Sequence, residues 1–595
     1  MKQVLFNPIY DKFPRGGSME GEEVTFTLRL SHSLRYQKVE ISLINDKTGE
    51  RSWFEMQKAD EDDNFATYQF TKKFEAGIFW YHFELMYYGE KTYIVQNEDF
   101  DSELSQTLTT SFAQIVAKKS HINYSKGVIY HIFVDRFCKS GKVKVREPLI
   151  ERKDWGGAIQ KNTTDPIKIN QEAFCGNLQG VIDKLDYIKS LGTDMIYLSP
   201  IFSSNSYHKY DTADYTQVDE MFGGNETFQK LIDEAKKRGI DILLDGVFNH
   251  TGSDSIYFNK EKRFSGDEGA YNSKKSKYFD WFNFERWPDK YESWWGILTL
   301  PCVNEDCEEY LDFIAGKGGI IEKYMKMGIK GFRLDVADEL SNHFLHKIEH
   351  RIKEFGSDKL VIGEVWEDAA IKSSYGVRKN YFTSGILDGV MNYPLKNGIL
   401  SYIETKNEKE LVRNMYALLD HYPKNAQYNQ MNIIGSHDSR RIATLIEEIT
   451  KDKEEQFKLL QIATILQYGF IGNPALFYAD ERGAKGGRAP LSRVCFPWEK
   501  VDTREEKWYK LLGSLRKSPI LKKGNFNLLF ADDGVVVFER EHNGDKMIFA
   551  TNLSSDDFEI SLKSAKDMLT GKTAVGEYIV KANNFAILKV KGENK

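Results

Sequence analysis

The stretch IIEKYMKMGIKGFRLDV (320–336) contains the pattern that decides the fold. Its first half places apolar residues at helical spacing, namely Ile321, Tyr324 and Met325. Gly328 ends that helix, because glycine adopts the left-handed backbone conformation of a helix end without steric strain. The apolar run that follows has the length of a buried strand. The stretch therefore predicts a helix followed by one strand of a parallel sheet.

The same unit occurs twice more upstream. The helical segment 185–191 precedes the strand MIYLSP (195–200), and the helical segment 228–235 precedes IDILLD (240–245). Five further candidate strands bring the count to eight: VIYHIF (128–133), LVIGEV (360–365), ILDGVM (386–391), MNIIGS (431–436) and ALFYAD (475–480). Eight strands that alternate with helices favour a closed (β/α)8 TIM barrel, of fold class α/β, over an open doubly wound sheet.

Short alternating strands flank this barrel on both sides. Residues 1–118 contain runs such as EVTFTLRL (23–30) between turns, which predicts an N-terminal β-sandwich. The barrel is predicted over 119–518, and alternating runs return over 519–595, which predicts a C-terminal β-sandwich, an all-β domain. A chain of 595 residues is too long for one compact core, so several domains are expected.

Composition limits the classes of partner and the cellular compartment. A net charge of −6 with interspersed acids and bases supplies no basic surface for nucleic acid or an anionic membrane, so a neutral ligand is expected. The start MKQVLFNPIY (1–10) does not resemble a secretory signal, and polar residues interrupt the most apolar later window, 459–479. Five cysteines, an odd number, fit reduced thiols better than a disulfide framework. These features predict a cytoplasmic location, and the isolated Cys302 and Cys307 predict no zinc site.

Polar side chains follow five of the predicted strands. Because the carboxyl ends of parallel strands meet at one face of a barrel, these side chains are expected to converge. Carboxylates flanked by His and Arg, which can hydrogen-bond hydroxyl groups, are what glycoside hydrolysis by a carboxylate pair requires. The residues are Tyr210 and Asp211, Asp245 and His250, Arg333 and Asp335, Glu364 and Trp366, and His437, Asp438 and Arg441.

The motifs around these residues resemble those of the alpha-amylase superfamily, glycoside hydrolase family thirteen, from about residue 126 to 498. Four segments resemble the main family signatures in order: DGVFNH (245–250), GFRLDVADE (331–339), GEVW (363–366) and GSHDSRR (435–441). MIYLSPIF (195–202) and GNPALFYADERG (472–483) resemble two more. GSHD together with VADE resembles the neopullulanase, cyclomaltodextrinase and maltogenic-amylase branch. The resemblance also implies a small domain inserted after the third strand, over about 251–304.

The resemblance implies a role for each site residue. Asp335 would be the nucleophile, Glu364 the general acid and then base, and Asp438 the stabiliser of the transition-state charge. Arg333, two residues before the nucleophile on the same strand, is expected to pair with Asp335 and keep it ionised. The remaining predicted substrate-binding residues are His250 and His437, which would donate to sugar hydroxyls, Tyr210, which would stack on a ring, Trp366 and Glu339, and, in supporting roles, Asp211 and Arg441.

This sequence departs from the branch at three places. Asp338 stands where the branch usually has Asn, and LPCVN (300–304) puts Cys302 where Lys is expected. The loop CKSGKVKVRE (138–147) has basic and apolar side chains where calcium-binding relatives have oxygen ligands. We therefore expect no metal and no cofactor, and the first two departures put the leaving-group-side preference in question.

Three functions remain open from the sequence. The favoured one is a retaining hydrolase that cleaves α-1,4 bonds, with some α-1,6 bonds, in maltooligosaccharides, starch, pullulan or cyclodextrins. The second is a glucanotransferase, in which a sugar hydroxyl displaces water from the same intermediate. The third is a non-catalytic glucan-binding barrel. The N-terminal domain is expected to bind glucan, to form a homodimer, or to do both. Trp53 and Trp80 are candidate sugar platforms, although core packing is the favoured role for either.

Overall fold

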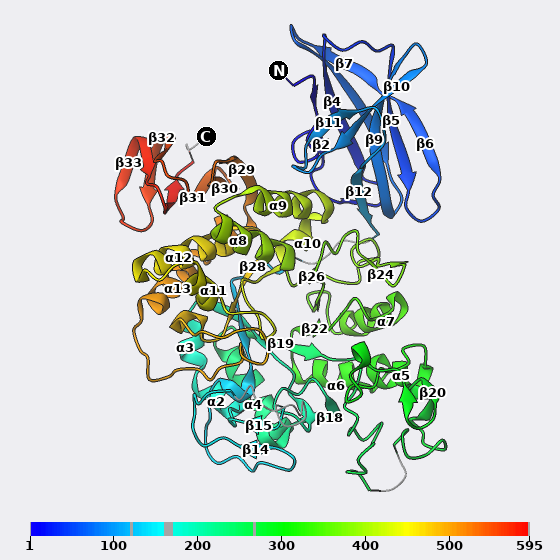
Figure 1. Cartoon of the computed structure of the whole chain (residues 1–595), viewed down its shortest axis with the longest axis vertical. Coiled ribbons are helices and arrows are strands. Elements are labelled where there is room, and N and C mark those ends of the chain that lie inside the picture. The colour runs from blue at the N-terminus through cyan, green and yellow to red at the C-terminus, as the bar shows by residue number, and fades with distance from the viewer. Residues whose placement is uncertain (1, 119–122, 160–169, 266–268, 593–595) are drawn as a thin grey trace.

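A central barrel of eight parallel strands organises the computed structural model, which describes residues 2–118, 123–159, 170–265 and 269–592 (Figure 1). Hydrogen bonds join neighbouring strands in chain order and pair the eighth strand with the first, and a parallel bridge between Met391 and Met431 closes the ring between the sixth and seventh strands. The predicted TIM barrel is thus confirmed. Its strands are β13 (Val128–Ile132), β16 (Thr193–Leu198), β19 (Asp241–Gly246), β22 (Gly331–Leu334), β23 (Leu360–Gly363), β26 (Gly389–Val390), β27 (Met431–Asn432) and β28 (Asn473–Phe477).

The barrel strands are buried because helices cover their outer side. Every residue of β22 and β23 is buried, which explains why these strands read as continuous apolar runs rather than alternating ones. The helix α6 (Ile320–Met327) ends at Gly328, whose φ of 105° is the left-handed conformation predicted for this glycine. The other outer helices include α4 (Gly224–Lys237), α7 (Asn342–Lys353), α9 (Lys409–His421) and α12 (Lys453–Gly469).

The N-terminal part is a sandwich of two sheets, as predicted. One sheet contains β4 (Glu23–Ser31) and β8 (Phe65–Lys73), and the other contains β5 (Lys38–Asn45) and β9 (Gly77–Tyr87). Alternate residues of β4 and β9 point into one apolar core, where Phe26 and Leu28 pack with Tyr81 and Phe83. The sandwich stands above the barrel in Figure 1 and contacts it through α9.

The C-terminal strands form one continuous hydrogen-bonded set of six, and the sandwich predicted for this region stays a prediction. Their hydrogen bonds join β29 (Asn525–Asp532), β30 (Val535–His542), β31 (Asp545–Asn552), β34 (Asn584–Val590), β32 (Phe558–Asp567) and β33 (Thr573–Val580) in that order. One face packs on the barrel, since Phe538 and Phe549 belong to the same apolar core as the barrel helices. The other face has its own cluster, which includes Val537 and Ile548. The all-β character is confirmed.

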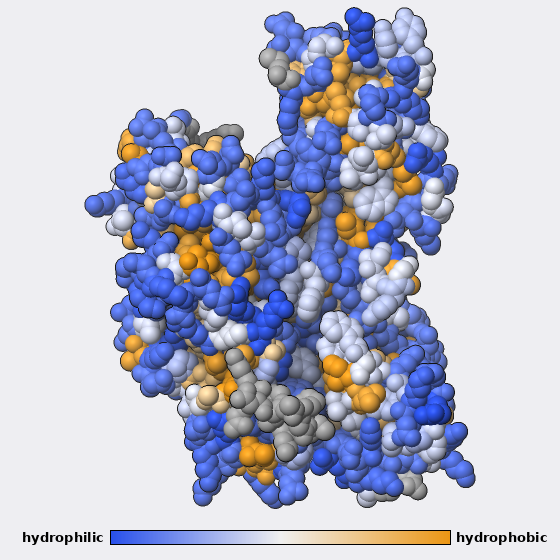
Figure 2. All heavy atoms as spheres, in the orientation of Figure 1, coloured by the Kyte–Doolittle hydropathy of each residue, from blue (hydrophilic) through white to orange (hydrophobic). Residues whose placement is uncertain are grey.

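The segment 251–304 after β19 has little regular structure. It contains two short strands, β20 (Phe284–Arg286) and β21 (Lys290–Tyr291), and two short 3-10 turns, and residues 266–268 of it lie outside the described residues. The predicted domain boundaries stay predictions, and the one at 118/119 borders residues 119–122, which also lie outside the description. The visible face of the molecule is mostly hydrophilic, with apolar residues in separate groups (Figure 2). Among the described helices, none has the length and apolar character that crossing a bilayer requires.

Candidate active site

A cavity of about 620 Å³ lies at the carboxyl ends of the barrel strands, where the sequence predicted the site. Its volume falls in the range of small-molecule binding sites. All three predicted carboxylates line it, together with other predicted residues that the next paragraphs describe. The lining comprises Asn170, His208, Tyr210, His250, Trp294, Trp295, Leu300, Asp335, Val336, Asp338, Glu339, Glu364, Trp366, Glu367, Lys372, Ser374, His437, Asp438, Ala489, Pro490 and Arg493.

Two of these carboxylates share one guanidinium. Arg333 on β22 contacts Asp335 Oδ1 through Nη1 and Glu364 Oε2 through Nη2, each at 2.7 Å. Asp335 follows β22 and Glu364 follows β23, and these neighbouring strands are in register. Because one guanidinium reaches both carboxylates, their oxygens lie within the span of a single fork. This arrangement is compatible with the separation of about 5 Å between the two carboxyl groups of retaining glycosidases.

Burial and crowding of like charges govern the ionisation of this pair. Burial raises the pKa of Asp335 well above its ordinary value. The positive charge of Arg333 opposes that rise, while repulsion from Glu364 and Asp245 adds to it. Arg333 was expected to keep Asp335 ionised, and the contact exists. However, Arg333 also pairs with Glu364 and with Asp245 at 2.7 Å, so its positive charge is shared among three acids. The effect of burial is therefore the larger one, and the pKa of Asp335 stays raised.

Replacing Arg333 with Met is expected to destabilise the protein by about 3–5 kcal/mol, the usual effect of leaving buried charges unpaired. Arg333 is fully buried, and its loss would leave Asp245, Asp335 and Glu364 without a cation. Urea denaturation at pH 7 measures this effect. Since protonation removes the unpaired negative charges, the loss in free energy of unfolding relative to the wild type should be smaller at pH 5.

The matched control is Arg263→Met. Arg263 pairs with Asp254 at 2.8 Å, and its side chain is 36% exposed, so its loss should have little effect on stability. An Arg333→Met variant as stable as the Arg263→Met control would contradict this description of the site.

The third carboxylate, Asp438, is held by two basic side chains. His437 Nε2 lies 2.9 Å from Asp438 Oδ2, and Arg493 Nη2 donates to Asp438 Oδ1 at 2.9 Å. Burial by itself would raise the pKa of Asp438, but His437 and Arg493 outweigh it and lower that pKa below its ordinary value. Asp438 is therefore an ionised acceptor that faces the cavity. Sequence reasoning missed Arg493, which lies in a loop without a periodic pattern.

Tyr210 forms the side of the cavity beside Asp438. Its ring stacks on that of His437, with centroids 5.1 Å apart. Its hydroxyl donates to Asp245 Oδ2 at 3.0 Å and lies 2.6 Å from His437 Nε2. His250 Nε2 lies 3.2 Å from the Tyr210 carbonyl oxygen, and burial lowers the pKa of His250 to about 4, so this ring is neutral near pH 7. These contacts fix the orientation of three predicted site residues.

Two aromatic side chains contact Glu364. The Trp366 indole is half exposed, stacks on Tyr393, and donates to Glu364 Oε1 at 3.2 Å. The Tyr393 hydroxyl also donates to Glu364 Oε1, at 3.3 Å. Tyr393 and the cavity-lining Trp295 were missed from the sequence. The position of Tyr393 directly after the sixth barrel strand was the available signal, by the same rule that found the other site residues.

Two predicted residues lie behind the site instead of in it. Asp211 and Arg441 are not among the described residues that line the cavity. Asp211 accepts hydrogen bonds from Ser204 and Ser206. Arg441 is fully buried, donates to Asp480 Oδ1 at 2.6 Å and covers the ring of Phe477. Both fix loops that support the site, as their expected supporting roles require, but the structure gives neither a place against substrate.

Of the two substitutions that depart from the branch pattern, only Asp338 reaches the cavity. It accepts from the Tyr381 hydroxyl at 2.8 Å and lies 3.2 Å from Lys372 Nζ. Cys302 is outside the set of described lining residues, and its backbone pairs with that of His250. Burial raises the pKa of the Cys302 thiol to about 12, so it is uncharged at neutral pH. Asp338 is therefore the departure that can affect substrate directly.

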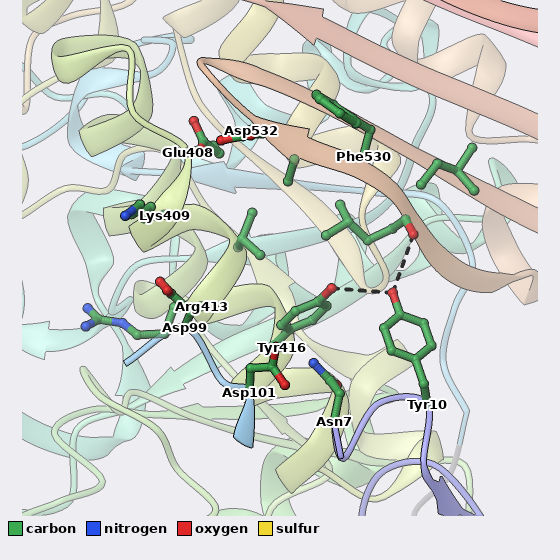
Figure 3. Close-up of a pocket in the computed structure, with 14 residues that line it drawn as sticks. Asn7, Tyr10, Asp99, Asp101, Glu408, Lys409, Arg413, Tyr416, Phe530 and Asp532 are labelled. Carbon is green, nitrogen blue, oxygen red and sulfur yellow. Dashed lines mark hydrogen bonds between the residues drawn. The ribbon is translucent and has the colours of Figure 1, made fainter. Parts of the chain in front are cut away.

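A second cavity lies between the N-terminal sandwich, α9 and the C-terminal sheet (Figure 3). Tyr10, Arg413 and Phe530 are among its lining residues, and it is remote from the strand ends that carry the carboxylate pair. Within the described residues, no group of three or more His, Cys, Asp or Glu side chains is placed to hold a metal ion. The predicted sugar platforms lie in the sandwich, where the Trp53 indole donates to Glu84 and the Trp80 indole to Asp46.

Comparisons with known proteins agree with this geometry. The family model described as alpha amylase, catalytic domain, matches residues 131–592. An amylopullulanase of Thermoanaerobacterium saccharolyticum is 31% identical to this chain. The match covers 96% of this chain and 50% of the length of that protein. The chain spans 34% of the length of a second amylopullulanase, from Thermoanaerobacterium thermosulfurigenes. It thus covers half or less of these curated relatives.

Shorter relatives match along more of their length. A cyclomaltodextrinase of Thermoanaerobacter pseudethanolicus is 34% identical over 72% of this chain and 70% of its own. A solved structure named cyclomaltodextrinase has a TM-score of 0.70 at 23% identity and covers 98% of this chain and 99% of its own, which supports the shared fold. Together with the family match, these findings identify the chain as a member of the alpha-amylase family, glycoside hydrolase family thirteen.

Proposed function

We propose that this protein is a retaining α-glucan hydrolase that cleaves α-1,4-glucosidic bonds, and some α-1,6 bonds, in maltooligosaccharides, starch, pullulan or cyclodextrins. The observation that carries the proposal is the pair Asp335 and Glu364 on one guanidinium in an open cavity, with the ionised Asp438 beside it. The names of the relatives, amylopullulanase and cyclomaltodextrinase, support α-linked glucans as the substrate class.

In the proposed mechanism, two displacements occur at the anomeric carbon. Asp335 attacks that carbon while Glu364 donates its proton to the glycosidic oxygen, so the leaving sugar departs as an alcohol and a glycosyl ester forms on Asp335. Glu364 then takes a proton from water, and the resulting hydroxide displaces Asp335 from the sugar. Each displacement inverts the anomeric carbon, so the product keeps the α configuration.

Asp438 and its neighbours would stabilise the transition states between these steps. An ionised carboxylate that faces the cavity attracts the positive charge that develops on the sugar ring and accepts hydrogen bonds from its hydroxyls. His437 and Arg493 hold Asp438 in place. The exposed indole of Trp366 offers an apolar face to a sugar ring next to Glu364. His437 would donate to a sugar hydroxyl, whereas neutral His250 gives its one N–H to the Tyr210 carbonyl oxygen, so we propose that His250 orients the Tyr210 segment instead.

A bell-shaped pH profile of kcat/KM is expected. As pH falls through the first apparent pKa of the carboxylate pair, Asp335 becomes protonated and cannot attack, so activity is lost. Because burial raises the pKa of Asp335 above its ordinary value of 3.8, this acid limb should lie above pH 3.8. As pH rises through the second apparent pKa, the pair loses its last proton and general-acid catalysis ends. This profile is measured from initial rates on maltoheptaose between pH 3.5 and 9, and circular dichroism excludes unfolding. An acid limb at or below pH 3.8 would contradict the raised pKa of Asp335.

A product profile on three substrates tests the proposed activity. Net release of reducing ends from maltotriose, pullulan and cyclodextrin is the expected result. Longer oligomers from maltotriose without net reducing ends would instead indicate a glucanotransferase, and binding without any cleavage would indicate a non-catalytic barrel. Panose or maltose from pullulan, and ring opening of cyclodextrin, each indicate a different specificity. Dimerisation, glucan binding by the N-terminal domain and cytoplasmic location remain predictions.

A further inference from the structure

The segment that follows β23 and Glu364 forms part of the cavity wall. We call residues 367–378 the cleft wall, because Glu367, Lys372 and Ser374 line the cavity. The wall contains a small hairpin of β24 (Ser373–Ser374) and β25 (Val377–Arg378). Tyr375 stands at the hairpin tip, 77% exposed, and its hydroxyl donates to Glu339 Oε2 at 2.7 Å. The hairpin therefore touches a second cavity residue, on the loop after Asp335.

The Glu339 carboxylate joins the cleft wall to the other side of the cavity. Its second oxygen, Oε1, accepts from the Trp295 indole at 3.3 Å. Trp295 is 68% exposed, stacks on Trp294, and Trp294 in turn stacks on His250. Tyr375, Glu339 and Trp295 thus form a continuous polar and aromatic rim. A displacement of the hairpin would remove one of the two hydrogen bonds that orient Glu339.

The N-terminal sandwich binds the far end of the cleft wall directly. Arg378 donates to Asp46 through Nε at 2.8 Å and through Nη2 at 2.9 Å, which is a bidentate pair. The Trp80 indole donates to the same carboxylate at 2.8 Å, and the Arg378 guanidinium lies over the Trp80 ring at 5.9 Å. Burial would raise the pKa of Asp46, but hydrogen bonds from Arg378 and Trp80 outweigh it and lower that pKa. Asp46 is therefore ionised at neutral pH.

The sandwich holds the near end of the cleft wall through α9. His421 Nδ1 lies 2.5 Å from Asp368 Oδ2, and the Ala369 amide donates to the Tyr422 hydroxyl at 3.0 Å. The preceding residue, Asp420, pairs with Lys12 of the sandwich at 2.5 Å, and both side chains are fully buried. Lys12 thus reaches the wall through two successive residues at the end of α9.

The end of α9 is seated closely on the sandwich. The Gly17 amide donates to the Tyr422 carbonyl at 3.1 Å, and a β-carbon at Gly16 would lie 2.9 Å from that carbonyl oxygen. The Phe100 ring packs against His421 with centroids 5.5 Å apart. Five residues before His421, the Tyr416 hydroxyl lies 3.4 Å from the Tyr10 hydroxyl, at the cavity drawn in Figure 3. This close packing restricts movement of α9 relative to the sandwich.

We propose that the N-terminal β-sandwich holds the cleft wall in position for glucan binding, with Asp46 as the positioning residue at one end and Lys12 at the other. The inference rests on the proposed function for its substrate. The hairpin itself has two residues in each strand and exposed Tyr375 and Val377 side chains, so it has few buried contacts of its own. Segments of this kind open easily, and contacts to a rigid neighbour then determine their order.

Asp46→Ala tests the proposal without removing a residue of the barrel. In this variant KM for maltoheptaose should rise about fivefold or more, while kcat changes less than twofold, because the carboxylate pair is untouched. Hydrogen exchange of backbone amides over 373–378 should become faster. Arg378→Ala removes the pair with Asp46 and also the hydrogen bond from Arg378 to the Ile371 carbonyl, so its rise in KM should equal or exceed that of Asp46→Ala. The double variant should not exceed Arg378→Ala, since the pair is already lost in that single variant.

Arg15→Ala is the matched control. Arg15 Nη1 donates to the Phe526 carbonyl at 2.7 Å, so it joins the sandwich to the C-terminal sheet, and within the described part of the chain it makes no hydrogen bond or ion pair with the cleft wall. Its KM and its exchange over 373–378 should equal those of the wild type. An unchanged KM and unchanged exchange in Asp46→Ala would overturn the proposal, as would equal effects of Arg15→Ala. If the wild type cleaves no glucan, the proposed function fails, whereas the exchange experiment still decides whether the sandwich holds the wall.

Discussion

Replacing Asp335 with Asn is expected to lower kcat on maltoheptaose by about 10⁴-fold or more. Asn has nearly the same shape as Asp but carries no negative charge, so it cannot form the glycosyl ester. The fold should survive, because Arg333 keeps Asp245 and Glu364 as acidic partners. Removal of one of three crowded acids relieves repulsion. The melting temperature should therefore be equal to that of the wild type or higher.

Asp254→Asn is the control for this substitution. Asp254 pairs with Arg263 outside the cavity, so its loss should leave kcat within about twofold of the wild type. Titration of the Asp335→Asn variant with maltoheptaose separates binding from chemistry, and binding should persist. Full glucan cleavage by Asp335→Asn would show that the assigned nucleophile is wrong.

Replacing Glu364 with Gln is expected to lower kcat on maltoheptaose by about 10²–10⁴-fold, the usual contribution of a general acid. Gln has nearly the same shape, and its one carbonyl oxygen can still accept from the Val336 amide, which lies 3.0 Å from Glu364 Oε2, but its NH2 group cannot accept from the Trp366 indole as Oε1 does. It cannot give a proton to the departing sugar. An α-maltosyl fluoride substrate needs little protonation, because fluoride is a good leaving group, so formation of the glycosyl ester from it should be affected far less.

The ratio between the loss of rate on maltoheptaose and the loss of rate on α-maltosyl fluoride identifies the role of Glu364. Pre-steady-state release of fluoride measures the first displacement, and the steady-state rate measures the second, for which Glu364 serves as the base. If Glu364 is the general acid, Glu364→Gln should lower kcat on maltoheptaose strongly and the rate of the fluoride burst only slightly. Equal losses on both substrates would mean that Glu364 acts on binding or structure instead of proton transfer.

The barrel was predictable because its signal is local and repeated. Helical spacing, a glycine such as Gly328 and a buried strand lie within one stretch of sequence, and all eight predicted strands are present. The pairing of the C-terminal strands was not predictable in the same way. Whether six strands such as β30 and β32 form two sheets or one depends on contacts between segments far apart in the chain, which their alternating patterns do not specify.

The candidate site followed from the same rule, since residues just after parallel strands meet at one end of a barrel. The rule found Asp335, Glu364 and Asp438, but it does not cover loops, and so it missed Arg493 and Trp295. It also placed Asp211 and Arg441 at the site, although neither is among the described residues that line the cavity. The attachment of the cleft wall to Asp46 was beyond reach, because it joins residues 332 positions apart.

Covalent trapping tests the central claim most directly. The protein is incubated with 5-fluoro-α-maltosyl fluoride, in which the added fluorine slows both displacements and allows the glycosyl ester to accumulate, and the proteolytic peptides are analysed by mass spectrometry. A single fluoromaltosyl group is expected on the peptide that contains Asp335, with the ester on that side chain. A label on Glu364 or Asp438, or steady turnover of the reagent without any labelled peptide, would contradict the assignment of Asp335 as the nucleophile of a retaining glycosidase.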